Sequence, residues 1–162
     1  MHPRALAQIL VLLALANGTP LAAKKALGTR LARPLDGNRA FVDGRPLFGH
    51  SKTLRGVALA ILVDAAAAPL LSLDWTVGAL AGGLAMIGDL ASSFVKRRLG
   101  RPPSSRATGL DQIPEALLPL LGCRGALGLS AIDIGIGVAL FFVGEVLVSR
   151  LLYRLRLRDR PY

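Results

Sequence analysis

The sequence is poor in cysteine, in aromatic residues and in charge. Its 162 residues include one cysteine, Cys123, so the chain forms neither an internal disulfide framework nor a zinc site built on cysteines. Aromatic residues make up 5% of the chain, which is thin for a surface that stacks on nucleic-acid bases. Charged residues make up 19% and apolar residues 52%. This balance excludes a disordered tail, a collagen-like repeat and a coiled coil.

The charge that is present is mostly basic and strongly clustered. Lys and Arg outnumber Asp and Glu by 20 to 10, which gives a net charge of +10. Only Arg4 and Arg124 lie outside the three basic clusters 24–55, 96–106 and 150–160. Apolar stretches with at most two charged residues separate the clusters, at 5–16, 57–73, 76–95 and 126–149. Basic clusters that alternate with long apolar stretches indicate a membrane protein with basic loops, and disfavour a nucleic-acid binder.

The apolar stretches predict the fold class. A membrane-spanning helix needs about 20 mostly apolar residues, and three stretches are close to that length. They do not alternate polar with apolar residues, which disfavours strands. We therefore predict an all-α, polytopic membrane helical bundle of about five transmembrane helices, in a single domain over residues 1–162. The predicted spans are 3–22, 57–73, 76–95, 108–122 and 128–149.

The basic clusters predict the orientation. Basic loops of membrane proteins lie in the cytoplasm, which places the loops 23–55 and 96–107 and the tail 150–162 inside and the N-terminus outside. An even number of spans must then separate the second and third clusters, so 108–122 is counted as a span although it is short and contains two prolines. The first apolar stretch has a second interpretation, a secretory signal peptide.

Acidic residues occur in every predicted span after the first. Ionisable groups at membrane depth are costly and usually mark a function. Asp89 stands out because Ser92, Ser93 and Lys96 follow it at helical spacing, so that one polar stripe leads from the basic loop into the membrane. For three other acids the sequence leaves open whether they lie near an interface or pair with a basic neighbour: Asp64, Asp133 and Glu145.

Asp111 opens the next predicted span at the same side of the membrane as Asp89. Two carboxylates on neighbouring helices, ringed by Lys and Arg, suit Mg²⁺ bound to a phosphate, because magnesium takes one or two carboxylates together with water and substrate oxygens. The alternative is a set of salt bridges from these aspartates to Arg97 or Arg106.

The first basic loop holds a glycine-rich segment, 44–56, with Lys52, Thr53 and Arg55. Glycine-rich backbone beside a lysine and a helix start is a common phosphate cradle. The segment departs from the P-loop pattern, because His50 stands where that pattern has its lysine. The alternative is an ordinary cytoplasmic loop whose glycines make turns.

These motifs follow one another in a recognisable order. They are Asn17-x-x-Pro20, Asp36-Gly37, Leu47-Phe48-Gly49-x-x-Lys52-Thr53-x-Arg55-Gly56, Gly88-Asp89-x-x-x-Ser93-Phe94-x-Lys96-Arg97-Arg98 and Asp111-Gln112. Over about residues 10–122 the chain thereby resembles the CDP-archaeol synthase family of integral-membrane CTP-transferases, which is related to the phosphatidate cytidylyltransferases. It departs at His50-Ser51, where an acidic or glycine-containing pair is expected, and it lacks the Pro-Gly-His-Gly-Gly stretch of the bacterial phosphatidate enzymes.

The resemblance implies a Mg²⁺-dependent cytidylyltransferase of phospholipid biosynthesis. Such an enzyme moves CMP from CTP to a membrane lipid phosphate and gives pyrophosphate and a CDP-archaeol-like or CDP-diacylglycerol-like lipid. It implies that Asp89 and Asp111 bind the metal and act in catalysis with Lys96 and Arg97. The nucleotide or lipid phosphate is then expected to contact Asn17, Lys52, Thr53, Arg55 and Ser93.

The expected partners are CTP, a lipid phosphate and membrane lipids, with no nucleic acid, and a homo-oligomer is left open. The expected location is the cell membrane, with the active site facing the cytoplasm. One rival function is a small non-enzymatic membrane transporter or scaffold with intramembrane carboxylates. Another is a CDP-alcohol phosphotransferase, whose motif begins in the style of Asp36-Gly37 but needs an Asp-x-x-x-Asp pair that does not follow.

Overall fold

Long helices account for most of this computed structural model, which describes residues 1–105 and 107–154. Arg106 and three arginines of the predicted tail, Arg156, Arg158 and Arg160, lie outside the described residues. The elements are α1 (Pro3–Leu27), α2 (Leu54–Ala67), the 3-10 turn η1 (Ala68–Leu71), α3 (Trp75–Arg98), α4 (Gln112–Gly122), α5 (Arg124–Leu127) and α6 (Ala131–Arg154). The described part of the chain has two isolated β-bridges and no named strand, which confirms the all-α class.

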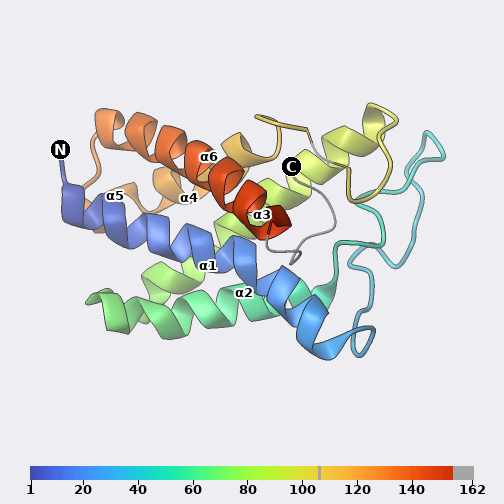
Figure 1. Cartoon of the computed structure of the whole chain (residues 1–162), viewed down its shortest axis with the longest axis horizontal. Coiled ribbons are helices and arrows are strands. Elements are labelled where there is room, and N and C mark those ends of the chain that lie inside the picture. The colour runs from blue at the N-terminus through green and yellow to red at the C-terminus, as the bar shows by residue number, and fades with distance from the viewer. Residues whose placement is uncertain (106, 155–162) are drawn as a thin grey trace.

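Four helices are long and apolar enough to cross a membrane, within the described residues. They are Pro3–Leu27, Leu54–Leu71, Trp75–Arg98 and Ala131–Leu151. Side chains such as Leu62, Leu70 and Leu147 are more than half exposed, as expected for surfaces that face lipid tails. Figure 1 shows these helices side by side along the longest axis, with the loop between α1 and α2 extending beyond the end opposite the N-terminus.

The predicted span 108–122 is shorter than expected. Helix α4 begins at Gln112 because the Asp111 side chain accepts a hydrogen bond from the Ala107 N–H at 2.9 Å, which closes a turn before it. Its 11 residues rise about 16 Å, about half the hydrocarbon core of a bilayer. The chain nevertheless reaches the other end of the bundle, since the Cys123 Sγ donates to the carbonyl of Val77, near the start of α3.

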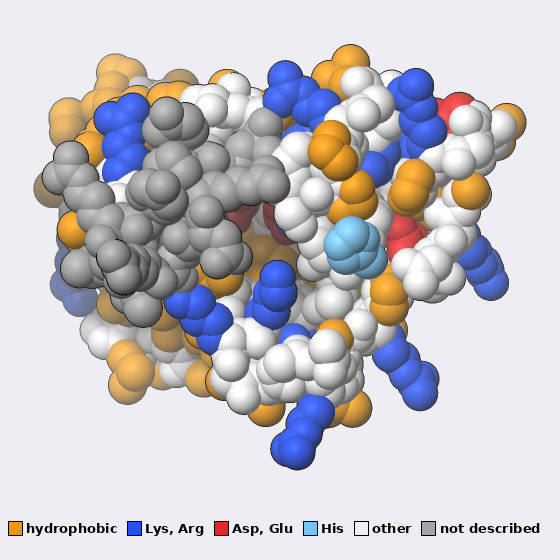
Figure 2. All heavy atoms as spheres, turned by 45° about the vertical axis from the view of Figure 1, so that its right-hand side comes forward, with side chains coloured by type: hydrophobic (Ala, Val, Ile, Leu, Met, Phe, Trp, Pro, Cys, Tyr) orange, Lys and Arg blue, Asp and Glu red, His pale blue; other side chains and the backbone are white. Residues whose placement is uncertain are grey.

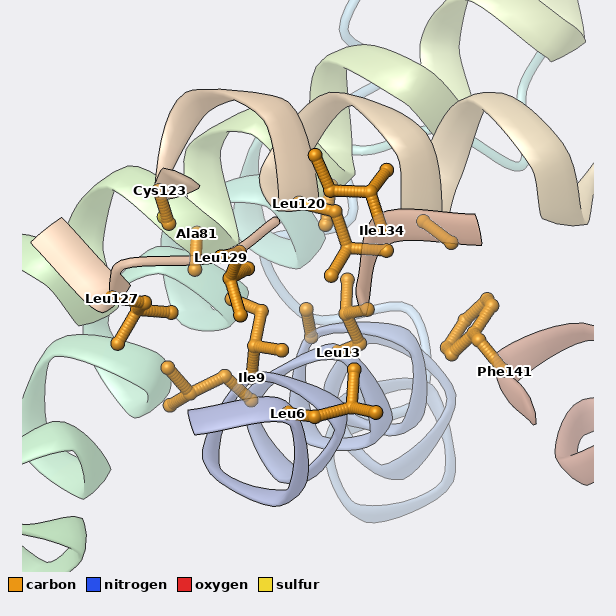
Figure 3. Close-up of a cluster of buried hydrophobic side chains, with 14 of the residues drawn as sticks. Leu6, Ile9, Leu13, Ala81, Leu120, Cys123, Leu127, Leu129, Ile134 and Phe141 are labelled. Atoms are coloured by element: carbon orange, nitrogen blue, oxygen red, sulfur yellow. The ribbon is translucent and has the colours of Figure 1, made fainter. Parts of the chain in front are cut away.

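Helix α1 is part of the protein core, which favours the membrane span over a removable signal peptide. Its residues Leu6, Ile9 and Leu13 are almost fully buried against Leu120 of α4 and Ile134 of α6. Figure 3 shows these side chains converging between the helices. A helix that supplies a large share of the packed apolar surface cannot be removed without exposing that surface.

The loop between α1 and α2, residues 28–53, is called the large loop. At the opposite end of the bundle, Asp133 holds two helices together. This fully buried carboxylate accepts hydrogen bonds from the backbone N–H of His2 at 3.0 Å and from the Ser130 hydroxyl at 2.7 Å. The His2 ring also meets it at 3.0 Å. Asp133 therefore joins the start of α1 to the start of α6, a structural contact far along the bundle from the other acids of interest.

Two pairs of helices approach closely because one partner presents glycine. A Cβ atom on Gly78 of α3 would lie 2.2 Å from the carbonyl oxygen of Asp64 in α2. A Cβ atom on Gly88 of α3 would lie 2.4 Å from the carbonyl oxygen of Pro114 in α4. Small residues of this kind let helix backbones meet in a membrane bundle. The second contact brings the residue after Gly88, which is Asp89, close to α4.

Candidate active site

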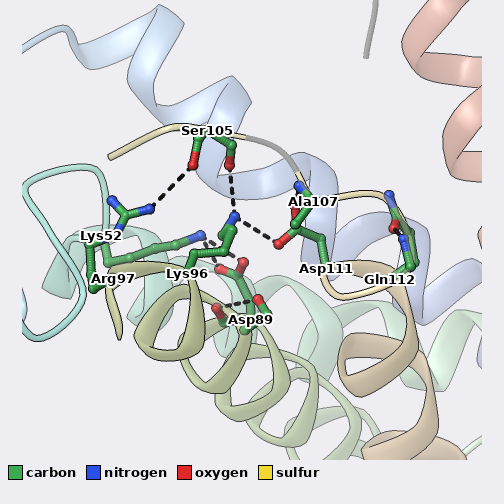
Figure 4. A network of polar contacts seen from close by, with 10 residues as sticks. Lys52, Asp89, Lys96, Arg97, Ser105, Ala107, Asp111 and Gln112 are labelled. Carbon is green, nitrogen blue, oxygen red and sulfur yellow. Dashed lines mark hydrogen bonds and ion pairs between the residues drawn. The ribbon is translucent and has the colours of Figure 1, made fainter. Parts of the chain in front are cut away.

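Two ion pairs form the centre of the site. The Lys52 Nζ atom lies 2.6 Å and 2.5 Å from the two carboxylate oxygens of Asp89. The Lys96 Nζ atom lies 2.7 Å from Oδ1 of Asp111. Figure 4 shows both pairs side by side above the last turns of α3. The predicted alternative had salt bridges from the aspartates to Arg97 or Arg106. Among the described residues the partners of the two aspartates are lysines and not Arg97, and Arg106 lies outside the described residues.

The loop 99–111 holds the second pair. Lys96 is buried at the end of α3 and donates to the backbone oxygen of Ser105 at 2.8 Å. Arg97 is also buried and donates from Nη2 to the Ser105 hydroxyl at 3.4 Å. Asp111 accepts from the Ala107 N–H, as described above. Ser105 and Ala107 of this loop therefore hold Lys96, Arg97 and Asp111 in place, as Figure 4 shows.

The loop 36–49 presents Lys52 to Asp89. Burial opposes the ionisation of Asp36, but hydrogen bonds from the N–H groups of Phe48, Gly49 and Asn38 outweigh burial and hold the pKa of that carboxyl below its usual range. Gly49 adopts a φ of 93°, and a Cβ atom there would lie 3.1 Å from Pro103 of the facing loop. The charged Asp36 thus closes the turn that leads into Lys52.

Arg98 attaches the same loop to α3. Its guanidinium donates to Asp43 at 2.8 Å and to the backbone oxygen of Pro46 at 2.6 Å. The guanidinium carbon also lies 4.9 Å from the ring centre of Phe41 and 4.8 Å from that of Phe94, within the range of cation–π attraction. Of the basic residues 96–98, Arg98 thus serves to hold the loop against α3 and does not line the cavity described next.

A cavity of about 210 Å³ opens at the two ion pairs. Five of the predicted site residues line it: Asn17, Lys52, Asp89, Lys96 and Asp111. Figure 2 shows a hollow on this face of the molecule, with Lys and Arg side chains around it and carboxylates inside it. The structure thus brings together residues from α1, the large loop, α3 and the start of α4.

Two further carboxylates, Glu115 and Glu145, line this cavity and were not among the predicted site residues. Glu115 is 5% exposed and lies within electrostatic reach of Asp89, Asp111 and Lys52. Glu145 has one carboxylate oxygen that is buried and has no hydrogen-bond partner among the described residues. The sequence could have indicated Glu115 as a site residue, because it lies four residues after Asp111 and therefore on the same helix face.

Ser93, Thr53 and Arg55 occupy other surroundings. Ser93 is 2% exposed inside the bundle and is not among the residues that line the cavity. The Thr53 hydroxyl caps α2 by accepting from the Gly56 N–H at 3.1 Å. Arg55 donates to the backbone oxygen of Arg30 and, at 3.2 Å, to that of Gly28.

A second, basic cavity of about 300 Å³ adjoins the first. Its lining includes Lys24, His50 and Arg55, and it shares Pro20 and Ser104 with the first cavity. Thr53 and Arg55, which were predicted to contact phosphate, therefore face this space.

A third cavity, of about 280 Å³, is an apolar groove between α1 and α6. Its lining runs from Leu10 along α1 and includes Leu140 and Phe141 of α6. It shares Asn17, Leu21 and Glu145 with the first cavity. The ion-pair cavity thus lies between an apolar groove and a basic cavity.

The carboxylates at the ion-pair cavity are the candidate ligands of a metal ion. In the described part of the chain, no three His, Cys, Asp or Glu side chains are grouped so that they could hold a metal ion. Of the four carboxylates that line the ion-pair cavity, those of Asp89 and Asp111 each already face a cation, the ammonium group of a lysine. Such oxygen donors suit a hard cation that also takes ligands from its substrate.

Comparison with protein-family models gives no match. Comparison with known proteins gives a clear one: the chain is 36% identical over 139 residues to a CDP-archaeol synthase of Sulfurisphaera tokodaii, covering 80% of this chain and 81% of that protein. A CDP-archaeol synthase of Saccharolobus islandicus is 41% identical over 85 residues, which cover 49% of this chain and 51% of that one. One of Hyperthermus butylicus is 38% identical over 104 residues, covering 60% and 59%.

A solved structure is also similar. It belongs to an intramembrane enzyme of archaeal membrane lipid biosynthesis and matches with a TM-score of 0.70 at 28% sequence identity. The match covers 85% of this chain and 90% of that one. Together with the four long apolar helices, it shows that the chain is a multi-pass membrane protein of that fold.

Proposed function

Because the chain belongs to the CDP-archaeol synthase family and is a cytidylyltransferase that forms a CDP-lipid, we propose that its substrate is the phosphate of an ether-type membrane lipid. We place the reaction in the ion-pair cavity. The observation that carries this proposal is the junction of two cavities: the cavity that holds Lys52, Asp89, Lys96 and Asp111 shares lining residues with an apolar groove.

The reaction is a displacement at the α-phosphorus of CTP. An oxygen of the lipid phosphate attacks this phosphorus and forms the new P–O bond. The bond from the α-phosphorus to the oxygen that bridges it to the β-phosphorus breaks, and pyrophosphate leaves with that oxygen and the electron pair. A phosphate oxygen is ionised at neutral pH, so no general base is required, and positioning and charge neutralisation supply the catalysis.

Lys52 and Lys96 are suited to hold the phosphates. Each ammonium group now faces a carboxylate inside a cavity, at 2.5 Å and 2.7 Å. A triphosphate that enters offers oxygens of the same charge, so each lysine exchanges one acceptor for another with little loss of electrostatic energy. The Asn17 side chain, at the junction with the groove, can donate from its amide to the lipid phosphate.

Asp89 and Asp111 would hold Mg²⁺. The two carboxylates line one cavity and supply the hard oxygen ligands that this ion prefers, while phosphate oxygens and water would complete its shell. When bound, the ion neutralises charge on the phosphates. Lys52 and Lys96 would then contact the nucleotide.

The apolar groove between α1 and α6 suits the hydrocarbon chains of the lipid. Its lining is largely apolar, and it ends at Asn17 and Glu145 beside the ion pairs. A lipid lying in it would carry its phosphate into the cavity. Burying an ester carbonyl without a hydrogen-bond donor costs free energy, so such a groove favours ether-linked over ester-linked chains.

The proposed orientation puts this cavity on the cytoplasmic side. Lys24, Lys25 and the run Lys96–Arg98 lie on the last turns of α1 and α3, at the same end as the large basic loop. Basic residues at helix ends favour the cytoplasm. A cysteine that replaces Arg101 should resist labelling from the outer side of sealed cells, and labelling there would contradict the orientation.

A panel of lipid phosphates tests the substrate. Purified protein in detergent is given CTP labelled in its α-phosphate, with either an isoprenoid ether lipid phosphate or a diacyl phosphatidate. We expect label in the lipid fraction, faster with the ether lipid, and none when EDTA removes Mg²⁺. Equal rates with both lipids would contradict the ether preference, and activity in EDTA would remove the metal. A glycerol phosphate without chains serves as the control.

A further inference from the structure

Exposed leucines and arginines lie together where α1 ends and α2 begins. Leu27, Leu31 and Leu54 are 41%, 79% and 51% exposed, and Arg30 and Arg33 are exposed as well. The Leu54 N–H donates to the Arg33 carbonyl at 3.0 Å, which brings the two chain segments together. None of these five residues, called the Leu/Arg surface, lines the three cavities described above.

The Leu/Arg surface lies at the level where two membrane spans end. Leu27 is the last residue of α1 and Leu54 is the first of α2, and both helices are long and apolar enough to cross a membrane. The Arg55 guanidinium joins these two ends, because it donates to the backbone oxygens of Arg30 and Gly28. The exposed leucines therefore lie at the boundary between the hydrocarbon and the headgroups of a bilayer.

Leu31 adopts a backbone conformation that leucine rarely takes. Its φ is 55°, in the left-handed region, where the Cβ atom crowds the following carbonyl oxygen. Contacts with the protein offset little of this cost, because most of the side chain is exposed. An apolar side chain held outward in this way is stabilised only when something outside the chain covers it.

The charge of the Leu/Arg surface indicates what covers it. The first acidic residue of the chain is Asp36, whose carboxylate is buried and accepts hydrogen bonds from backbone N–H groups. None of the ion pairs among the described residues involves Arg30 or Arg33. A second copy packed on this surface would set like charges against one another, whereas an anionic lipid supplies the opposite charge.

We propose that the Leu/Arg surface binds anionic phospholipid headgroups in the leaflet on its side of the membrane. The leucines enter the upper acyl region, and the two arginines reach the phosphates of the headgroups. Each arginine near an anionic membrane surface strengthens this attraction by about fivefold.

The Leu/Arg surface is also connected to Lys52. Beside the hydrogen bond between Leu54 and Arg33, the Leu35 N–H donates to the Lys52 carbonyl at 2.8 Å. The Lys52 ammonium group in turn faces Asp89 in the ion-pair cavity. Headgroups that hold the surface therefore also hold the segment that presents this lysine. We expect anionic lipid to raise the rate of CMP transfer for this reason, a consequence that rests on the proposed function.

A nitroxide spin label tests the contact with the membrane. Leu31→Cys and Val42→Cys of the purified full chain are labelled and placed in vesicles of phosphatidylcholine and phosphatidylglycerol, and the native Cys123 is buried. We expect oxygen dissolved in lipid to relax the label at position 31, and a water-soluble nickel complex to relax the label at position 42, since Val42 is 96% exposed on the large loop. Equal access of the nickel complex to both labels, or spin–spin broadening at position 31 from a second copy, would overturn the inference.

The rate of CMP transfer tests the charge of the headgroups. Phosphatidylglycerol replaces part of the phosphatidylcholine at constant lipid phosphate, and it is not itself an acceptor because its phosphate is a diester. We expect a gain of about threefold in the wild type and in Arg39→Gln, an exposed arginine of the large loop outside the surface, and no gain when Arg30→Gln and Arg33→Gln are combined. Equal gains in the two variants would contradict the inference. The spin-label measurement needs no turnover, so its outcome is separate from failure of the proposed reaction.

Discussion

Asp89→Asn lowers the rate of CMP transfer by about a thousandfold and leaves the protein folded. The change removes the charge that would hold Mg²⁺ and that now positions Lys52. Loss of one well-placed electrostatic contact in an active site lowers the rate by a factor on the order of 10² to 10³. This variant disturbs two such contacts, the one to Mg²⁺ and the one to Lys52. The measurement is the initial rate of label transfer from CTP to lipid in detergent.

Stability separates this effect from unfolding. The side chains of Lys52 and Asp89 are each 23% exposed, and a partly exposed ion pair contributes about 1 kcal/mol or less to stability. The matched control is Asp74→Asn on the same helix, because Asp74 caps the other end of α3 and asparagine caps about as well. Should Asp89→Asn keep more than a tenth of the wild-type rate, the role given to this carboxylate is wrong.

Gly88→Ala destabilises the protein and reduces activity together. The new Cβ atom would lie 2.4 Å from the carbonyl oxygen of Pro114 and 2.7 Å from Cα of Glu115, so α3 and α4 must separate. Overpacking of this kind costs about 1–3 kcal/mol. Separation of the helices also moves Asp89 away from Asp111, so we expect a rate loss of tenfold or more by the order-of-magnitude sensitivity of active sites to small displacements.

Gly83→Ala is the control for that prediction. Gly83 lies on the same helix, and a Cβ atom there meets nothing within 4 Å. Alanine in an open helical position is more favourable than glycine by about 0.5–1 kcal/mol, so this variant should melt at the same or a higher temperature. Thermal unfolding and transfer rate are measured for both variants. Equal behaviour of Gly83→Ala and Gly88→Ala would show that the close approach of α3 to α4 is not needed.

Much of the fold was predictable because it follows from local composition. The apolar stretches mark α1, α2, α3 and α6 to within a few residues, since about 20 mostly apolar residues in a row match the hydrocarbon core of a bilayer. The helix ends were less accurate: α3 continues to Arg98 because Lys96 and Arg97 are held by the following loop. The length of α4 depends on the Asp111 turn and on packing against Gly88, which are tertiary contacts.

The sequence predicted which residues form the candidate site, but not which of them form ion pairs with one another. Lys52, Asp89, Lys96 and Asp111 all line one cavity, as the motifs indicated. The pairing of Lys52 with Asp89 depends on the loop that Asp36 and Arg98 fold, and no sequence spacing encodes it. Glu145 reaches the cavity because α6 packs against α1 and α4. Its place in an apolar span marked it as unusual, but the sequence did not show which residues it would meet.

The fate of the two ends of CTP tests the central claim most directly. Purified protein, Mg²⁺ and a lipid phosphate are incubated with CTP labelled either in the α-phosphate or in the γ-phosphate. A cytidylyltransferase puts the α-label into the lipid fraction and releases the γ-label as water-soluble pyrophosphate, in equal amounts. Transfer of the γ-label to the lipid, or of neither label, would contradict the account.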